Sequence, residues 1–120
     1  MIDHVKVGVS DLQKAKGFYG KALAPLGYAL HFEAEGMAYF ADATSLDFGV
    51  GASDRPGGSH VGFTAPDSAG VRAFYDAALS AGGADNGAPG LRPEYGSRYY
   101  AAYVLDADGN NIEAKCHEPE

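Results

Sequence analysis

The stretch Gly58-Ser59-His60-Val61-Gly62-Phe63-Thr64-Ala65 repeats the beginning of the chain, which reads Asp3-His4-Val5-Lys6-Val7-Gly8-Val9. When the two copies are aligned at their histidines, the match continues without a gap through Phe18-Tyr19 on Phe74-Tyr75 and Gly27 on Gly83. Two copies of one unit predict a pseudo-symmetric pair of modules, because a solenoid needs about three or more repeats.

Each copy is predicted to form a strand, a helix and three more strands. In the first copy, apolar residues alternate over 2–9, and a helical pattern follows the N-cap signal at Ser10-Asp11 and ends at Pro25 and Gly27. The remaining strands of this copy are expected at residues 29–33, 37–41 and 46–51.

In the second copy, we expect a strand at 60–65, a helix that begins at Asp67 or Ser68 and ends at Gly82-Gly83, and strands at 99–105 and 111–116. Residues 87–96 are rich in Gly and Pro and are predicted to form a loop over the sheet. The expected fold is α+β, with one domain over residues 1–120 built from βαβββ modules at about 1–52 and 57–117.

Composition narrows the class of protein. The chain has 120 residues, 46% of them hydrophobic, and a net charge of −7. These values predict a folded core and disfavour nucleic acid as a partner. Cys116 is the single cysteine, so no disulfide forms within the chain. No apolar run approaches the ~20 residues of a membrane span, and no export signal is recognised, so a cytoplasmic location is expected.

Strand alternation places four polar side chains on the sheet face opposite the helices. His4 and His60 are related by the repeat, and a gap of two turn residues in the alignment places Asp47 on Glu113. If the two halves curve together into an open barrel, these side chains converge in its cavity. Two imidazoles and one or two carboxylates form a site for a borderline or hard divalent ion.

Each of these residues also has an ordinary explanation, since a single histidine or a single strand carboxylate is commonly just a solvated side chain. The repeat that relates them favours His4, His60 and Glu113 as metal ligands. Asp47 is one methylene shorter than Glu, so it is either a fourth ligand or a hydrogen-bonding residue beside the ion. Lys6 and Lys115 share the cavity face and are available to carboxylates or an anionic substrate, and Tyr39 and Tyr103 are symmetry-related candidates for pocket walls.

The chain resembles the vicinal oxygen chelate superfamily, which includes glyoxalase I, extradiol dioxygenases and proteins of bleomycin and fosfomycin resistance. The resemblance rests on four features of the sequence: His4-Val5, Ser10-Asp11-Leu12 with Phe18-Tyr19, His60-Val61, and Asp106-x-Asp108-Gly109-Asn110-x-Ile112-Glu113. It implies an open barrel of strands around one divalent metal (Zn, Ni, Co, Mn or Fe), held by His4, Asp47, His60 and Glu113. It also implies a homodimer and a small-molecule substrate that chelates the metal through two neighbouring oxygens.

The leading functional prediction is a glyoxalase-like lyase or isomerase in which Glu113 and Asp47 are catalytic. If Asp47 does not bind the metal, the two histidines and Glu113 form the ligand set of a ferrous extradiol dioxygenase. A non-catalytic antibiotic-binding protein is the third alternative. Glyoxalase I has a longer ligand where Asp47 stands and an arginine for glutathione where Gly8 stands, which disfavours a glutathione substrate. The segment 90–100 is expected to shape specificity.

Overall fold

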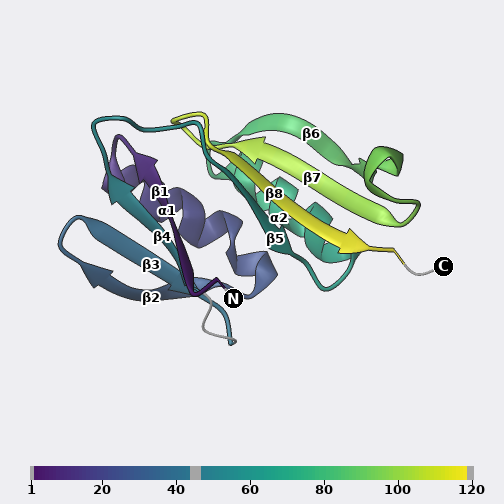
Figure 1. Cartoon of the computed structure of the whole chain (residues 1–120), viewed down its shortest axis with the longest axis horizontal. Coiled ribbons are helices and arrows are strands. Elements are labelled where there is room, and N and C mark those ends of the chain that lie inside the picture. Colours follow the sequence, from purple (N-terminus) through teal and green to yellow (C-terminus); the bar gives the residue numbers. More distant parts are fainter. Residues whose placement is uncertain (1, 44–46, 119–120) are drawn as a thin grey trace.

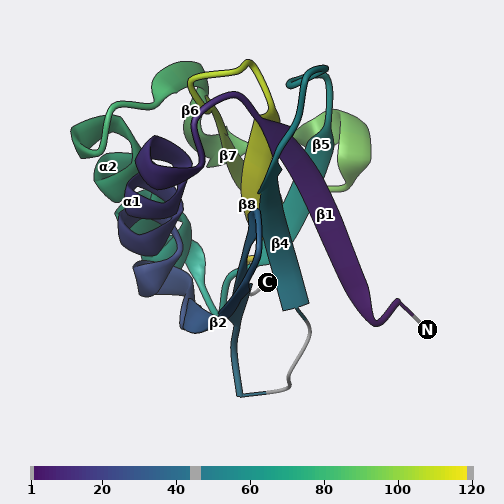
Figure 2. The same ribbon diagram turned by 90° about the vertical axis from the view of Figure 1, so that its left-hand side faces the viewer.

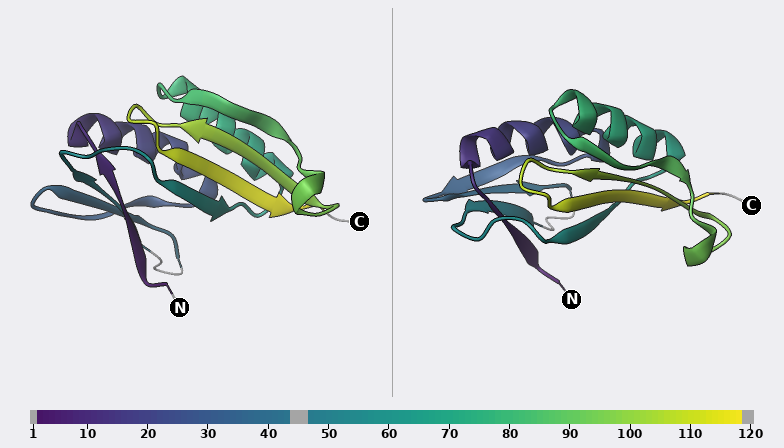
Figure 3. Two further views of the ribbon diagram at one scale, coloured as in Figure 1. Left: turned by 45° about the horizontal axis from the view of Figure 1, so that its top comes forward. Right: turned by 90° about the horizontal axis from the view of Figure 1, so that it is seen from above.

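The computed structural model describes residues 2–43 and 47–118. Two four-stranded sheets lie side by side along the long axis of a molecule that measures 45 × 28 × 24 Å (Figure 1). Both long helices lie on the same side of the sheets, and neither of them covers the opposite faces of the sheets (Figures 2 and 3). This second, uncovered side is called the open face below.

The first module has the strand order β1-β4-β3-β2, in which β1 is parallel to β4 and the other neighbours are antiparallel. Its elements are β1 (His4–Val9), α1 (Leu12–Ala22), the 3-10 helix η1 (Ala24–Leu26), β2 (Ala29–Ala34), β3 (Met37–Ala41) and β4 (Asp47–Ala52). Leu46, with which the strand predicted at residues 46–51 begins, is outside the described residues.

The second module repeats this topology, with the order β5-β8-β7-β6 and β5 parallel to β8. Its elements are β5 (His60–Thr64), α2 (Ser68–Ser80), β6 (Ala84–Leu91), the 3-10 helix η2 (Pro93–Tyr95), β7 (Tyr99–Leu105) and β8 (Asn111–His117). The predicted pair of βαβββ modules is therefore confirmed. Within the described residues no hydrogen-bonded ladder joins the two sheets, so the barrel is open.

Both helices begin where the sequence predicted a cap. Asp11 accepts a 3.1 Å hydrogen bond from the Lys14 backbone N–H, and Asp67 accepts one of 2.8 Å from that of Gly70. Gly27, after η1, has a φ of 87°, which a residue with a side chain adopts only with strain. Among residues 2–43 and 47–118, no helix is long and apolar enough to cross a membrane.

The core lies between the helices and the sheets. Tyr19 of α1 and Phe74 of α2 are fully buried there, and Cys116 is a buried free thiol whose pKa is raised by burial. Aromatic side chains and free cysteines commonly occupy such a core. The core fixes the side of each sheet that faces the helices, and it thereby leaves the other side for polar residues.

The prediction of a loop at 87–96 was wrong. Residues 87–91 belong to β6 and residues 93–95 form η2. β6 is an edge strand that pairs with β7 through register shifts between Asp85 and Gly87 and between Gly87 and Gly90. The glycines and Pro89 are typical of an irregular edge strand. Proline has no backbone N–H, and an edge position tolerates this because one side of the strand has no neighbour to bond. Gly87 has a φ of 150°, which only glycine adopts readily.

The turn between β7 and β8 joins the two modules. Asn110 is fully buried; its Nδ2 donates to the carbonyl of Gly8 in β1 at 3.1 Å, and its Oδ1 accepts from the Ser59 N–H at 3.1 Å. Asp106 in the same turn accepts a 2.6 Å hydrogen bond from the hydroxyl of Tyr19 in α1. The stretch 106–110 is thus a turn whose side chains bond to protein groups.

Candidate metal centre

His60 and Glu113 meet on the open face of the second module. They lie on the adjacent parallel strands β5 and β8, and His60 Nε2 is 3.0 Å from Glu113 Oε1. The Glu113 side chain is 7% exposed, whereas that of His60 is 53% exposed. Gly62 is the register partner of Glu113, and a Cβ at Gly62 would stand 3.5 Å from Oε1. Both predicted ligands of this module therefore point at the same place.

Tyrosines surround this pair. A cavity of about 230 Å³ is lined by His60, Tyr95, Tyr99, Tyr103 and Glu113. The Tyr99 hydroxyl donates a 2.6 Å hydrogen bond to Glu113 Oε2. Burial and then the Glu113 carboxylate raise the pKa of Tyr99, and burial is also the main cause of the raised pKa of Tyr103. These phenols stay protonated at neutral pH, so Tyr99 remains a hydrogen-bond donor to the carboxylate.

The first module carries the other two predicted ligands. His4 and Asp47 are register partners on β1 and β4. His4 is half-exposed, and its Nδ1 lies 2.9 Å from Asp3 Oδ1. Asp47 Oδ1 is buried without a hydrogen-bond partner among the described residues. His4 and Asp47 are thus neighbours on adjacent strands, on the shared sheet face that the alternation of apolar and polar residues predicted.

The strand register corrects the sequence alignment at Asp47. Tyr103 is paired with Glu113 in the second module, and its repeat mate Tyr39 is paired with Gly49 in the first. Likewise, His60 faces Asn111, whereas His4 faces Asp47. The mate of Glu113 is therefore Gly49, and the gap of two residues that placed Asp47 on Glu113 was wrong.

In the first module, the position equivalent to Glu113 is Gly49, and it has no room for a side chain. The ring of Tyr39 lies over Gly49, so that a Cβ at Gly49 would be only 2.7 Å from Tyr39 Cε1. Phe32 stacks on the other side of this ring at a centroid distance of 4.8 Å and an interplanar angle of 10°. The two modules thus have the same backbone but different open faces, and a carboxylate stands at the centre of only the second.

The single chain does not assemble the full predicted ligand set. Within residues 2–43 and 47–118, no three His, Cys, Asp or Glu side chains converge closely enough to hold an ion. The structure brings together His60 and Glu113, and separately His4 and Asp47. Tyr95 and Tyr99 were not identified from the sequence, although Tyr99 shares its strand face with Tyr103, and this parity was the available signal.

The His60–Glu113 pair fits a divalent ion. An imidazole nitrogen and a carboxylate oxygen are ligands that zinc, manganese and iron accept. Two donors that are each about 2.1 Å from an octahedral ion and at right angles to each other lie about 3.0 Å apart, which is the separation of these two atoms. Two protein donors leave a centre incomplete, so further ligands are needed.

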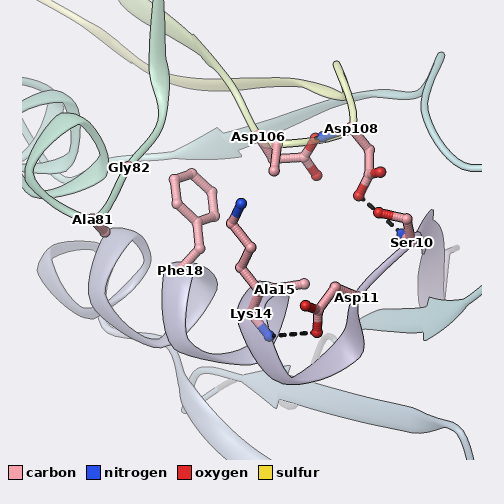
Figure 4. A pocket seen from close by; sticks show the side chains of 10 residues that line it. Ser10, Asp11, Lys14, Ala15, Phe18, Ala81, Gly82, Asp106 and Asp108 are labelled. Carbon is pink, nitrogen blue, oxygen red and sulfur yellow. Dashed lines mark hydrogen bonds between the residues drawn. The ribbon is translucent and has the colours of Figure 1, made fainter.

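Two other cavities are less suited to chemistry. One of about 260 Å³ lies between the start of α1, the end of α2 and the β7–β8 turn, and Figure 4 shows the Lys14 side chain reaching into it beside Phe18. Its carboxylates Asp106 and Asp108 already accept hydrogen bonds, from Tyr19 and from the Ser10 N–H respectively. A second cavity, of about 320 Å³, contacts Asp47 and is lined mainly by apolar residues from β1, β4 and β5.

Comparison with known proteins identifies the family. The model of the "Glyoxalase/Bleomycin resistance protein/Dioxygenase superfamily" matches residues 1–114. The chain belongs to this superfamily. No curated protein matches the sequence.

Solved structures agree with this membership. A glyoxalase/bleomycin resistance protein from Albidiferax ferrireducens T118 is 32% identical, with a TM-score of 0.85 over 94% of this chain and 96% of that one. A glyoxalase-related enzyme from Fulvimarina pelagi is 19% identical, with a TM-score of 0.75 over 96% and 86%. The E126Q mutant of FosX, a fosfomycin resistance protein from Listeria monocytogenes, is 17% identical, with a TM-score of 0.72 over 100% and 90%. The last two show the superfamily fold alone.

Proposed function

We propose that this superfamily member is a metal-dependent lyase or isomerase of the glyoxalase type that acts on a small substrate. The observation that carries the proposal is the convergence of His60 Nε2 and Glu113 Oε1 at 3.0 Å inside a tyrosine-lined cavity. The buried Glu113 carboxylate accepts a hydrogen bond from Tyr99 and lies beside His60, and a cation bound between the imidazole and the carboxylate would compensate the buried charge.

In this proposal, His60 and Glu113 hold the ion and the tyrosines shape the space above it. A divalent ion bound there supplies Lewis-acid stabilisation of negative charge on two neighbouring oxygens of the substrate. Tyr99 fixes the Glu113 carboxylate through Oε2, which leaves Oε1 aimed at His60. Glu113 is the candidate base, in a state in which its Oε1 would not bind the ion, since Oε2 is held by Tyr99.

The remaining ligand is proposed to come from a second copy of the chain. β1 and β5 are both edge strands, and open edges are commonly covered in symmetric dimers. His4 is half-exposed at the start of β1 and is not joined to the His60–Glu113 pair within its own chain. In a homodimer, His4 would complete the partner's centre, and Asp47 would accompany it as its register neighbour.

The known structure of FosX supports an ion of this kind, since that protein was solved with Mn(II) and 1S,2S-dihydroxypropylphosphonic acid. One observation favours a second candidate. Because Gly49 and not Asp47 is the mate of Glu113, the repeat no longer supports Asp47 as a ligand, and without Asp47 the set is two histidines and one carboxylate. That set is typical of ferrous oxygenases, so an extradiol-type dioxygenase remains the alternative.

Metal titration tests the proposal. We expect the wild-type chain to bind one Mn²⁺ or Zn²⁺ per chain, measured by calorimetry and by metal analysis after gel filtration. Glu113→Gln keeps the shape but removes the charge, and it should lower affinity at least about 100-fold. Asp47→Asn, the matched change in the other module, should lower it far less. If Glu113→Gln binds metal as wild type does, the site is elsewhere.

The identity of the bound metal distinguishes a lyase or isomerase from a dioxygenase. Protein purified without oxygen and then analysed for metals should contain nickel, zinc, cobalt or manganese if it is a lyase or isomerase. Iron, together with oxygen consumption on addition of catechols, would instead favour the dioxygenase.

A further inference from the structure

Two basic side chains flank the tyrosine-lined cavity. The Arg92 guanidinium lies over the Tyr103 ring, with Cζ 5.4 Å from the centroid, and the Lys115 ammonium lies over the Tyr99 ring, with Nζ at 5.6 Å. Both tyrosines line the cavity that holds Glu113. Both cations are partly buried, unlike most lysines and arginines, which stay in water.

Neither cation has a carboxylate partner in the part of the chain that the structure describes. Arg92 is held by backbone carbonyls instead: Nη2 donates to Ala88 at 2.6 Å and Nη1 to Leu91 at 3.4 Å. The chain has 16 acidic and 9 basic residues, so carboxylates are in excess. Two cations beside one cavity that lack a carboxylate partner among the described residues therefore require an explanation.

The irregular strand β6 makes room for the guanidinium. A Cβ at Gly90 would be 3.1 Å from Arg92 Nη1, and one at Gly87 would be 3.3 Å from Nη2 and 2.9 Å from Tyr103 Cδ1. Side chains at these two positions would push Arg92 away from Tyr103. Gly87 and Gly90, which made this segment resemble a loop, therefore leave room for the Arg92 guanidinium over the Tyr103 ring.

We propose that Arg92 and Lys115 bind the anionic group of the substrate, a carboxylate or a phosphonate, while its neighbouring oxygens reach the metal. This proposal rests on the metal centre proposed above, because the bare Glu113 carboxylate would repel an anion and a divalent ion reverses that charge. Guanidinium groups hold carboxylates and phosphonates through paired N–H donors, and an ammonium adds a point charge.

The test uses Mn²⁺-loaded full-length protein and three small probes: glycolate, hydroxymethylphosphonate and the neutral ethylene glycol. Binding is followed by the loss of water-proton relaxation at Mn²⁺ and by calorimetry. We expect at least one of the two anions to bind about tenfold or more tightly than ethylene glycol, and the preferred anion assigns the carboxylate or the phosphonate class.

Variants then locate the anion site. Arg92→Gln and Lys115→Gln should each weaken the preferred anion about tenfold, while Mn²⁺ affinity, titrated separately, stays within about twofold. Arg72→Gln is the matched control, because Arg72 belongs to α2 on the covered side of the same sheet and should change neither value.

The outcomes separate the two proposals. Wild-type protein that fails to bind Mn²⁺ overturns the metal centre and, with it, the anion site. Wild-type protein that binds Mn²⁺ but does not prefer either anion overturns the anion site alone, as does an Arg92→Gln, Lys115→Gln double variant with undiminished anion affinity.

Discussion

The Tyr99 hydroxyl and the Glu113 carboxylate are joined by a 2.6 Å hydrogen bond, while the second oxygen of the same carboxylate lies 3.0 Å from His60. One oxygen is therefore anchored and the other is aimed at the imidazole. A ligand whose orientation is fixed in advance loses less entropy when it binds an ion, and outer hydrogen bonds of this kind commonly contribute 10- to 100-fold to metal affinity.

Removal of this anchor should weaken metal binding without unfolding the protein. We expect Tyr99→Phe to lower Mn²⁺ affinity by about 10- to 100-fold, measured by calorimetry, with an unchanged circular dichroism spectrum. Tyr95→Phe is the control, since Tyr95 lines the same cavity but is 65% exposed. Equal effects of the two variants would argue against an orienting role for the Tyr99 hydroxyl.

The shared centre predicts complementation between two defective chains. His4→Ala and Glu113→Gln proteins should each bind little metal alone. If His4 serves the partner's centre, a dimer with one chain of each kind contains one intact ligand set. An equal mixture that has been unfolded and refolded should then recover about one quarter of the wild-type metal per chain. Failure to recover metal, with dimers present by sedimentation, would place His4 outside the centre.

Asn110 is expected to hold the two modules together. Asn110→Ala removes the bonds to Gly8 and Ser59 and leaves their buried groups unpaired, which should lower the free energy of unfolding by about 2–4 kcal/mol in urea. Its neighbour provides the control. Asn111 has a buried Oδ1 without a partner among the described residues, so Asn111→Ala should cost less than about 1 kcal/mol. Equal costs for the two substitutions would contradict the role of Asn110 as a clamp.

Stability should fall in alkaline solution. Burial raises the pKa of Tyr19 and Tyr99 above the ordinary value of 10.0. Above that pH, the unfolded chain loses phenolic protons that the folded chain retains, so the unfolded state binds fewer protons and the free energy of unfolding decreases as pH rises. Urea unfolding at pH 8 to 11 should show no tyrosine-linked change up to about pH 9.5 and a decline beyond it.

Tyr19→Phe provides the control for this pH dependence. The variant should be less stable at pH 8, because Asp106 loses a hydrogen-bond donor, but its decline at high pH should be shallower. A wild-type protein whose stability stays constant up to pH 11 would contradict the prediction.

The fold was predictable because two independent signals agreed. The repeat that begins at His4 and His60 indicated two modules, and the period of the apolar residues gave the helices and most strands. The strand β6 was missed because Gly87, Pro89 and Gly90 are typical of a loop. Propensity alone does not reveal that an edge position beside β7 tolerates these residues.

The sequence predicted which sheet face the candidate residues share, but not which residues of the two modules are equivalent. Side chains alternate with a period of two, so a slip of one residue turns every side chain to the wrong face, whereas a slip of two keeps each on the correct face. The alignment of Asp47 on Glu113 contained such a slip, and parity could not expose it. Only the pairing of Tyr39 with Gly49 and of Tyr103 with Glu113 did so.

The second module has a carboxylate at Glu113 where the first has Gly49. The Tyr39 ring over Gly49 makes this difference hard to reverse by mutation. A carboxylate gained at position 49 would bring its Cβ to 2.7 Å from Tyr39 Cε1, and the ring is held from behind by Phe32. Crowding of this kind destabilises by about 1–3 kcal/mol. Tyr39 therefore has to be replaced before a carboxylate at position 49 can be accommodated. The difference between the two open faces thus depends on the order in which substitutions occur, which is a form of epistasis.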